Sequence, residues 1–361
     1  MASPTEPMLR AALAQLKDPV TGEDLISAGR LDSLDIRGGM VQVGLRTTRE
    51  EAPRMEALRR EAQALLARQP GVANATVVLT AHAAPAAAPA GRGGTARPTL
   101  LSEARAVVAV ASGKGGVGKS TVAVNLAVSL ARQGFEVGLL DADIYGPSLP
   151  RMLGIHGKPP IVAEKLQPIE IWGLRAMSIG LLVDEETPMI WRGPMVMGAL
   201  EQLMGQVAWG PLDVMILDMP PGTGDAQLTV AQRVKLAGAV IVSTPQDVAL
   251  LDARRGVRMF ERTNVPVLGL VENMSYFCCP NCGHRTDIFG HGGAQAEAAR
   301  LGIEFLGEVP LLAEVRRLSD AGTPVAAHAP DSEAAKAYAA IAARLAAKLA
   351  GAPAGPKIVI D

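Results

Sequence analysis

Two short stretches of this 361-residue chain combine residue types and spacings that can do chemistry. The first, GKGGVGKST, fits the phosphate-binding pattern G-x-x-x-x-G-K-[ST]. Its glycines let backbone N–H groups curl around phosphate oxygens, and the following helix points its positive end at the same anion. The pattern predicts Mg-ATP binding, with Lys119 at the β- and γ-phosphates and Ser120 as a Mg²⁺ ligand. The predicted loop comprises Gly113, Lys114, Gly115, Gly116, Val117, Gly118, Lys119, Ser120 and Thr121.

The second stretch is FCCPNCGH, which holds all 3 cysteines of the chain. Cys279 and Cys282 have the C-x-x-C spacing of metal ligands, but a closed thiolate site usually needs four soft ligands. Four interpretations remain open at this point. The pair could be a redox dithiol, a zinc knuckle completed by His284 and His291, or thiols packed as small apolar groups. Alternatively, two chains related by a twofold axis could join their pairs around one [4Fe–4S] cluster.

The elements that must position these residues follow from the hydrophobic pattern. After Leu100, short apolar runs alternate with helical segments, which is typical of an α/β fold with a doubly wound, mostly parallel sheet. The phosphate loop follows the first run directly and precedes a helix, as a P-loop requires. The expected strands lie at residues 106–112, 136–143, 213–219, 238–244, 267–273 and 305–310.

Composition divides the chain into four segments. We expect a small α+β domain at 1–82, a Pro/Ala/Gly-rich linker at 83–99, a P-loop ATPase domain at 100–350 and a tail at 351–361. The periodicity of the first segment predicts two helices, at residues 8–16 and 52–69. It also predicts three strands, one on each side of Gly38-Gly39 and one at 72–82.

The overall composition excludes several classes of protein. Lys+Arg 35 against Asp+Glu 36 gives a net charge of -1, which argues against broad binding of nucleic acid or anionic membrane. The chain has no apolar stretch that could span a bilayer and no signal peptide, so we expect a cytoplasmic protein. The Ala-rich helix predicted at 332–351 should pack on the protein rather than bind a membrane. Three methionines that follow Trp191 suit core packing or a dimer face: Met195, Met197 and Met204.

The phosphate loop resembles the variant Walker A motif of the nitrogenase iron protein, cell-division and partition ATPases. That resemblance implies that Lys114 crosses a dimer interface to the nucleotide of the partner, so that hydrolysis depends on dimerisation. It also implies that Asp143, in LLDADIYGPS, positions the attacking water and that Asn273, in VENMS, reads adenine. Asp218, in ILDMPPGTGD, ends a predicted strand and suits the Mg²⁺ shell.

Several motifs together resemble the Mrp/ApbC family of iron–sulfur cluster carrier ATPases: VENMSYFCCPNCGHRTDIFGHGG, DADIYGPSLPRMLG, WRGPM and LDMPPGTGD. The resemblance implies a homodimeric ATPase that holds a labile [4Fe–4S] cluster on Cys279 and Cys282. It further implies delivery to apoproteins, with cluster assembly factors as partners, while Cys278 lies outside the CPxC pattern. The first segment resembles a MIP18-like domain, but Ala52 stands where many such domains carry a cysteine.

Three other functions compete with the carrier. The main alternative is a positioning or partition-type P-loop ATPase with a structural zinc knuckle. A second is a scaffold that binds ATP without appreciable turnover and presents its first domain to partners. A third is a reductase like the nitrogenase iron protein, which the C-x-x-C spacing disfavours, because that protein uses well-separated single cysteines.

Overall fold

A computed structural model of the chain describes residues 4–37, 40–47, 51–72, 74–81, 100–182 and 193–351. The chain forms two compact units, Met1–Thr95 and Ala96–Asp361. The predicted turn at Gly38-Gly39, the linker, Trp191 and the tail from residue 352 lie outside the described residues. The predicted domain boundaries therefore stay predictions.

In its described residues, the first unit is a three-stranded sheet with two helices. Strands β1 and β2 are antiparallel, β2 and β3 are parallel, and the order is β1-β2-β3. The core is formed by residues such as Leu13, Val43 and Met55. The elements are α1(Glu6–Leu13), β1(Leu31–Arg37), β2(Met40–Thr47), α2(Ala52–Ala67) and β3(Asn74–Ala81).

The second unit is built on a nine-stranded sheet in the order β13-β12-β11-β4-β10-β5-β9-β8, with β14 also paired to β12. All six strands expected after Leu100 are present, and they pair in parallel as predicted. The strands are β4(Ala104–Ala111), β5(Val137–Asp141), β8(Ile169–Ile171), β9(Leu174–Ser178), β10(Leu212–Asp218), β11(Gly238–Ser243), β12(Val267–Cys278), β13(Arg285–Thr286) and β14(Phe305–Leu311).

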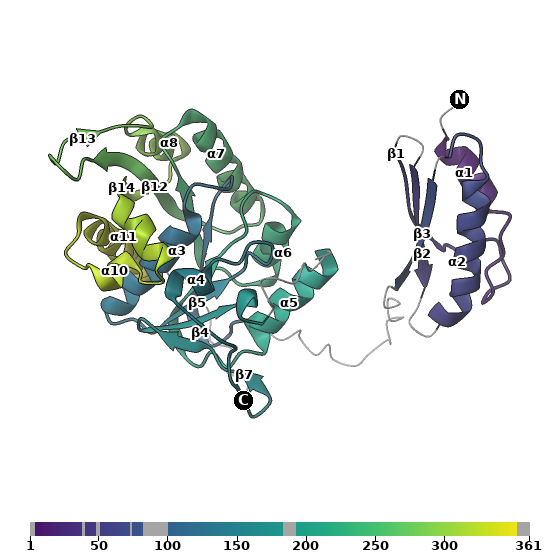
Figure 1. Cartoon of the computed structure of the whole chain (residues 1–361), viewed down its shortest axis with the longest axis horizontal. Helices are drawn as coiled ribbons and strands as arrows, with labels where there is room; N and C mark the ends of the chain where they lie inside the picture. The colour runs from purple at the N-terminus through teal and green to yellow at the C-terminus, as the bar shows by residue number, and fades with distance from the viewer. Residues whose placement is uncertain are drawn as a thin grey trace. The chain divides into compact units, whose positions relative to one another are not determined.

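Helices cover both faces of this sheet, so the predicted doubly wound α/β fold is confirmed (Figure 1). One face carries α3(Lys119–Arg132), α4(Leu149–Leu153), α9(Ala313–Asp320), α10(Val325–His328) and α11(Glu333–Gly351). The other elements are β6(Ile161–Val162), β7(Lys165–Leu166), η1(Ile179–Leu181), α5(Gly193–Gly205), α6(Asp225–Arg233), α7(Asp247–Arg262) and α8(Gly293–Leu301). The C-terminal helix α11 packs on α3 and β14 through buried residues such as Tyr338 and Leu345, as expected from its Ala-rich face.

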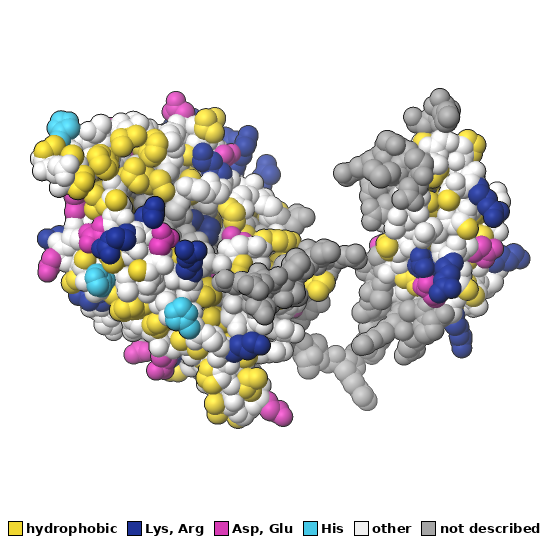
Figure 2. All heavy atoms as spheres, viewed as in Figure 1, with side chains coloured by type: hydrophobic (Ala, Val, Ile, Leu, Met, Phe, Trp, Pro, Cys, Tyr) yellow, Lys and Arg dark blue, Asp and Glu magenta, His cyan; other side chains and the backbone are white. Residues whose placement is uncertain are grey.

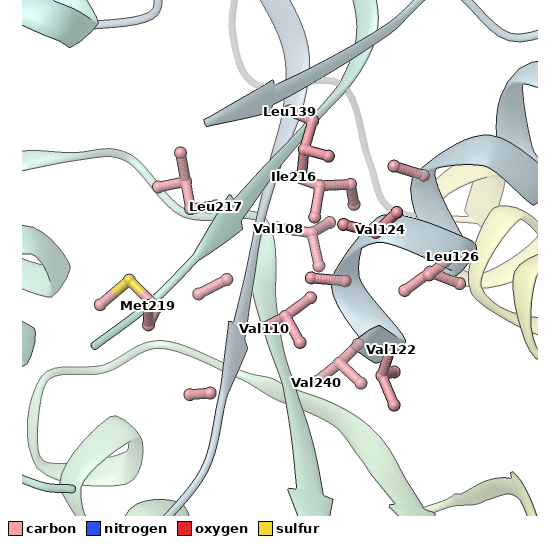
Figure 3. Packing of buried hydrophobic residues seen from close by; sticks show 14 of the residues in the cluster. Val108, Val110, Val122, Val124, Leu126, Leu139, Ile216, Leu217, Met219 and Val240 are labelled. Atoms are coloured by element: carbon pink, nitrogen blue, oxygen red, sulfur yellow. The ribbon is translucent and has the colours of Figure 1, made fainter. Parts of the chain in front are cut away.

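The core between the sheet and α3 fixes the start of that helix. Figure 3 shows Val108 and Val110 of β4, Ile216 of β10 and Val240 of β11 on the face of the sheet toward α3, a helix whose Val122, Val124 and Leu126 belong to the same core. All these side chains are buried, and their burial supplies most of the stabilisation of such a layer. The packing therefore holds the N-terminus of α3 directly above the end of β4.

Candidate functional site: a phosphate loop and a cysteine knuckle

The carboxyl ends of three neighbouring strands meet at one point of the sheet. Strand β10 lies between β4 and β5, and in this register Asp218 pairs with both Asp141 and Val110. The chain crosses from one side of β4 to the other here, which is where ligands bind in open α/β sheets. The predicted phosphate loop, Asp141 and Asp218 are therefore brought together.

The phosphate loop adopts a conformation that requires glycine. Gly118 caps α3 with φ 78°, in the left-handed region, and a Cβ there would collide with the Asn273 amide. Gly113 presses against the backbone of Asp252 in α7, where a Cβ has no space either. By contrast, a Cβ on Gly115 or Gly116 would meet nothing within 4 Å. The tip of the loop is thus open toward the side where an anion would lie.

Lys119 and Asp218 form a buried ion pair at the base of this loop. The Lys119 ammonium also lies 3.2 Å from the Ser120 hydroxyl. Burial raises the pKa of Asp218, although Lys119 opposes that shift. The second oxygen, Asp218 Oδ2, has no hydrogen-bond partner among the described residues. An orphaned carboxylate oxygen beside a hydroxyl fits a hard cation such as Mg²⁺, which takes oxygen ligands.

Asp141 has a structural role that its sequence position alone did not reveal. Its side chain is fully buried, and its two oxygens accept hydrogen bonds from three backbone N–H groups and one hydroxyl. The donors are Asp143 N at 3.1 Å, Ser148 N at 3.0 Å, Leu149 N at 3.2 Å and Ser178 Oγ at 3.1 Å. Burial and the nearby Asp218 carboxyl raise the pKa of Asp141 to about 7. Asp141 therefore holds the loop that carries Asp143.

Asp143, in contrast, is half-buried and accepts one long hydrogen bond, from Gly146 N at 3.3 Å. It borders a cavity of about 630 Å³ between the loop after β5, the loop after β10 and α5. The cavity wall includes Tyr145, Met197, Pro220 and Gln227. Of the methionines, Met204 is buried in the core, whereas Met195 is half exposed.

These two neighbouring acids should respond oppositely to substitution. Asp141→Ala leaves several buried N–H groups without an acceptor, so we expect it to lower the free energy of unfolding by about 2–3 kcal/mol. Asp143→Ala should change stability by less than about 0.5 kcal/mol but reduce ATP turnover by at least about a hundredfold. Urea unfolding and phosphate release measured on both variants test this. Equal stability losses would refute the division of roles.

Asn273 lies next to the phosphate loop and is buried. Its amide nitrogen donates to the Val117 carbonyl at 2.9 Å, and its side chain is buried beneath the phosphate loop. In this state Asn273 supports the loop. Its predicted contact with adenine stays a prediction.

The cysteines lie on a tight hairpin at the end of β12. Cys279 N donates to His284 O at 3.0 Å, and Gly283 N donates back to Cys279 O at 2.9 Å. Cys279 is half-buried, Cys282 is exposed, and both are free thiols. Hydrogen bonds from the backbone N–H groups of Asn281 and Cys282 lower the pKa of Cys279, which favours the ligating thiolate. Burial and Glu333 raise the pKa of Cys278.

The described residues of one chain do not assemble a zinc site. Among residues 4–351, leaving aside the gaps in the described ranges, no three His, Cys, Asp or Glu side chains gather in a way that could hold a metal ion. His291 instead lies 3.3 Å from Arg285 and 3.9 Å from Asp287. The knuckle therefore presents two thiols and no further ligand of its own.

No sequence pattern predicted the polar contacts that the structure shows around β12. Glu272 is fully buried and accepts a hydrogen bond from Ala294 N at 2.7 Å, at the start of α8. Tyr276 donates to Glu333 of α11 at 2.8 Å, and the Arg285 guanidinium stacks 3.6 Å above its ring. These contacts tie the hairpin to two helices. Across all the described ranges, no helix is long and apolar enough to cross a membrane.

The fold and the phosphate loop together define a P-loop NTPase. A nucleotide-binding protein from Archaeoglobus fulgidus, solved with ADP, has a similar structure with TM-score 0.56 and 46% identity, over 62% of this chain and 88% of that one. The cell-division ATPase MinD of Pyrococcus furiosus shares the fold, with TM-score 0.51 and 20% identity, over 67% of this chain and 98% of that one.

Residues 103–346 match the NUBPL iron-transfer P-loop NTPase family, and the chain belongs to that family. Residues 6–77 match an iron-sulfur cluster assembly protein family. An iron-sulfur cluster carrier protein of Synechocystis is 44% identical over 343 residues, covering 93% of this chain and 96% of the relative. An Arabidopsis thaliana iron-sulfur protein required for NADH dehydrogenase is 53% identical over 69% of this chain and 80% of the relative. The family resemblance read from the motifs is thus confirmed.

Proposed function

We propose that this protein is an ATP-dependent carrier of iron–sulfur clusters. It would bind and hydrolyse ATP, hold a labile [4Fe–4S] cluster as cargo and pass that cluster to apoproteins. One observation carries the proposal: an accessible C-x-x-C knuckle, which finds no third ligand among the described residues, lies on the same chain as a phosphate loop. Two such knuckles supply the four thiolates of a [4Fe–4S] cluster. The relatives named as cluster carriers support the same function.

A homodimer through the nucleotide edge of the sheet would bring two knuckles together. Large apolar side chains are exposed in loops and helices that follow the carboxyl ends of parallel strands or the knuckle: Tyr145 at 62%, Val248 at 64%, Leu251 at 49% and Ile288 at 52%. Figure 2 shows hydrophobic side chains gathered over the β13–α8 region, next to the knuckle. Exposed apolar surface of this kind marks interaction sites.

In this dimer the chemistry of hydrolysis is electrostatic. Lys119 offsets charge on the β- and γ-phosphates, and Lys114 does so for the nucleotide of the second copy. Ser120 and Asp218 would hold Mg²⁺, which supplies further positive charge when bound. Asp143 orients the attacking water from the loop after β5. We propose slow turnover, in which movement of the loops after β5 and β10 couples hydrolysis to loading or release of the cluster.

The role of Lys114 in trans can be tested by mixing two inactive variants. Lys114→Ala should bind nucleotide but lose about a hundredfold to a thousandfold of its turnover, because its partner lacks the second cation. A chain carrying Lys119→Ala keeps Lys114 and can donate it. Equimolar mixing should therefore restore phosphate release to a sizeable fraction of the wild-type rate. A mixture as inactive as its parts would contradict the shared site.

The carrier function itself is tested by transfer. Protein reconstituted anaerobically is mixed with an apoenzyme that needs a [4Fe–4S] cluster, and the activity gained is followed with and without a strong iron chelator. We expect full activation at one cluster per apoenzyme and resistance to the chelator. Activation that the chelator abolishes would mean release of free iron, not transfer. The partition-type alternative predicts one zinc per chain and no activation.

The remaining assignments belong to the same proposal. We place a MIP18-like domain at 1–82, the linker at 83–99, the ATPase domain at 100–350 and the tail at 351–361. The first domain would dock apoproteins or cluster assembly factors without thiolate ligands, since all 3 cysteines lie outside it. Free thiols and a labile cluster suit a reducing compartment, for which we propose the cytoplasm.

A further inference from the structure

One strand carries residues of both sites. Strand β12 places Asn273 under the phosphate loop and ends at Cys278, beside the first cysteine of the knuckle. Only residues 274–276 separate Asn273 from Phe277, where the hairpin ladder begins. A displacement of this short segment should therefore also move the hairpin that carries the knuckle.

The first of these residues bends the strand. Met274 has φ 56°, in the left-handed region that residues with a Cβ avoid. At the same place the ladder between β12 and β14 loses its register, between Asn273 and Phe277. A strained backbone of this kind persists only where the surroundings fix it.

Contacts fix the strand on both sides of the bend. Before it, the Asn273 amide bonds to the Val117 carbonyl of the phosphate loop at 2.9 Å, and the buried Glu272 carboxylate accepts from Ala294 N at 2.7 Å. After it, Tyr276 is bonded to Glu333, and Phe277 pairs with Thr286 across the hairpin. The upstream restraint includes the loop that binds nucleotide.

Resting on the proposed function, we propose that Met274 is a strained joint through which nucleotide at the phosphate loop sets the position of Cys279. A nucleotide that draws the Asn273 amide away from Val117 removes one restraint on the bend. The backbone at Met274 then relaxes toward the extended form, and the hairpin moves with it. Cys279, now half-buried, becomes more accessible. Met274 acts as a positioning residue through the strand.

Two substitutions at this position should act in opposite directions. Met274→Gly removes the cost of the left-handed conformation, so the bend should persist with or without nucleotide. Met274→Val raises that cost, because a β-branched side chain tolerates this conformation poorly, so the strand should relax even without nucleotide. The knuckle sequence is unchanged in both variants.

The readout is the alkylation rate of Cys279 in cluster-free protein, measured by peptide mass with iodoacetamide, with and without ADP. We expect ADP to raise this rate about tenfold in the wild type. The glycine variant should stay slow and the valine variant fast in both conditions. The exposed Cys282 provides an internal reference whose rate should change little. Titration with a fluorescent ADP analogue confirms that each variant binds nucleotide.

The proposed role of Met274 would be refuted if ADP raised the alkylation rate of Cys279 in both variants as it does in the wild type. It would also be refuted if ADP did not change that rate in the wild type. If the Met274→Val variant does not fold, the Met274→Gly variant alone tests the proposal, through the effect of ADP on its Cys279 alkylation rate. Failure of the proposed function gives a different result, because wild-type protein would then hold no iron and sulfide after reconstitution while Cys279 still responds to ADP. The two hypotheses are thus separated.

Discussion

Lys119→Ala is expected to abolish ATP turnover, with a loss of at least about a thousandfold. Lys119 is the first residue of α3, and its side chain is buried at the base of the phosphate loop with only 6% exposed. Nucleotide affinity should fall as well, because we propose Lys119 as the cation that reaches the β- and γ-phosphates. Phosphate release and ADP titration measure the two effects. Turnover at the wild-type rate would show that this loop is not the catalytic site.

A control must separate lost chemistry from lost stability. Lys119 pairs with Asp218, whose side chain is fully buried, and removal of one partner of such a pair costs about 3–5 kcal/mol. Because Asp218 can take up a proton, the observed loss should lie at the lower end of that range. The double variant Lys119→Ala/Asp218→Asn removes the unpaired acid and should regain stability in urea unfolding. It should remain inactive.

The second large effect is expected at the knuckle. Cys279→Ser and Cys282→Ser should each lose nearly all of the iron that the wild type retains after anaerobic reconstitution and desalting, because each would remove two of the four thiolates of the proposed shared cluster. Cys278→Ser is the matched control, since Cys278 is adjacent but lies beside Glu333. This variant should retain wild-type iron content. Loss of iron in all three would mean that the hairpin, not a specific pair, was disturbed.

The parts of the fold that rest on long apolar runs were predictable. Runs such as 106–112 and 213–219 became the central strands β4 and β10, because strands buried on both faces need continuous apolar sequence. The short antiparallel edge strands β8 and β13 were missed. Each spans two or three residues, and their pairing depends on neighbours brought together by the tertiary fold.

The sequence identified residues that meet at the carboxyl edge of the sheet, but their roles in binding and catalysis stay predictions. Asp141 is the last residue of β5 and Asp143 lies two positions later. Only the hydrogen bonds that Asp141 accepts from Asp143, Ser148 and Leu149 show that the first supports the second. Likewise, no sequence pattern predicts that Met274 bends its strand, since a methionine with a left-handed backbone conformation has no sequence signature. These features arise from contacts between segments distant in sequence.

Iron and sulfide content per chain, measured with the mass in solution after anaerobic reconstitution, tests the shared cluster most directly. We expect about four irons and about four sulfides per dimer, and a monomer or a cluster-free dimer when Cys279 is replaced by serine. One zinc per chain, independent of dimerisation, would contradict the proposed function as a cluster carrier. It would make the knuckle a structural element and the protein a partition-type ATPase.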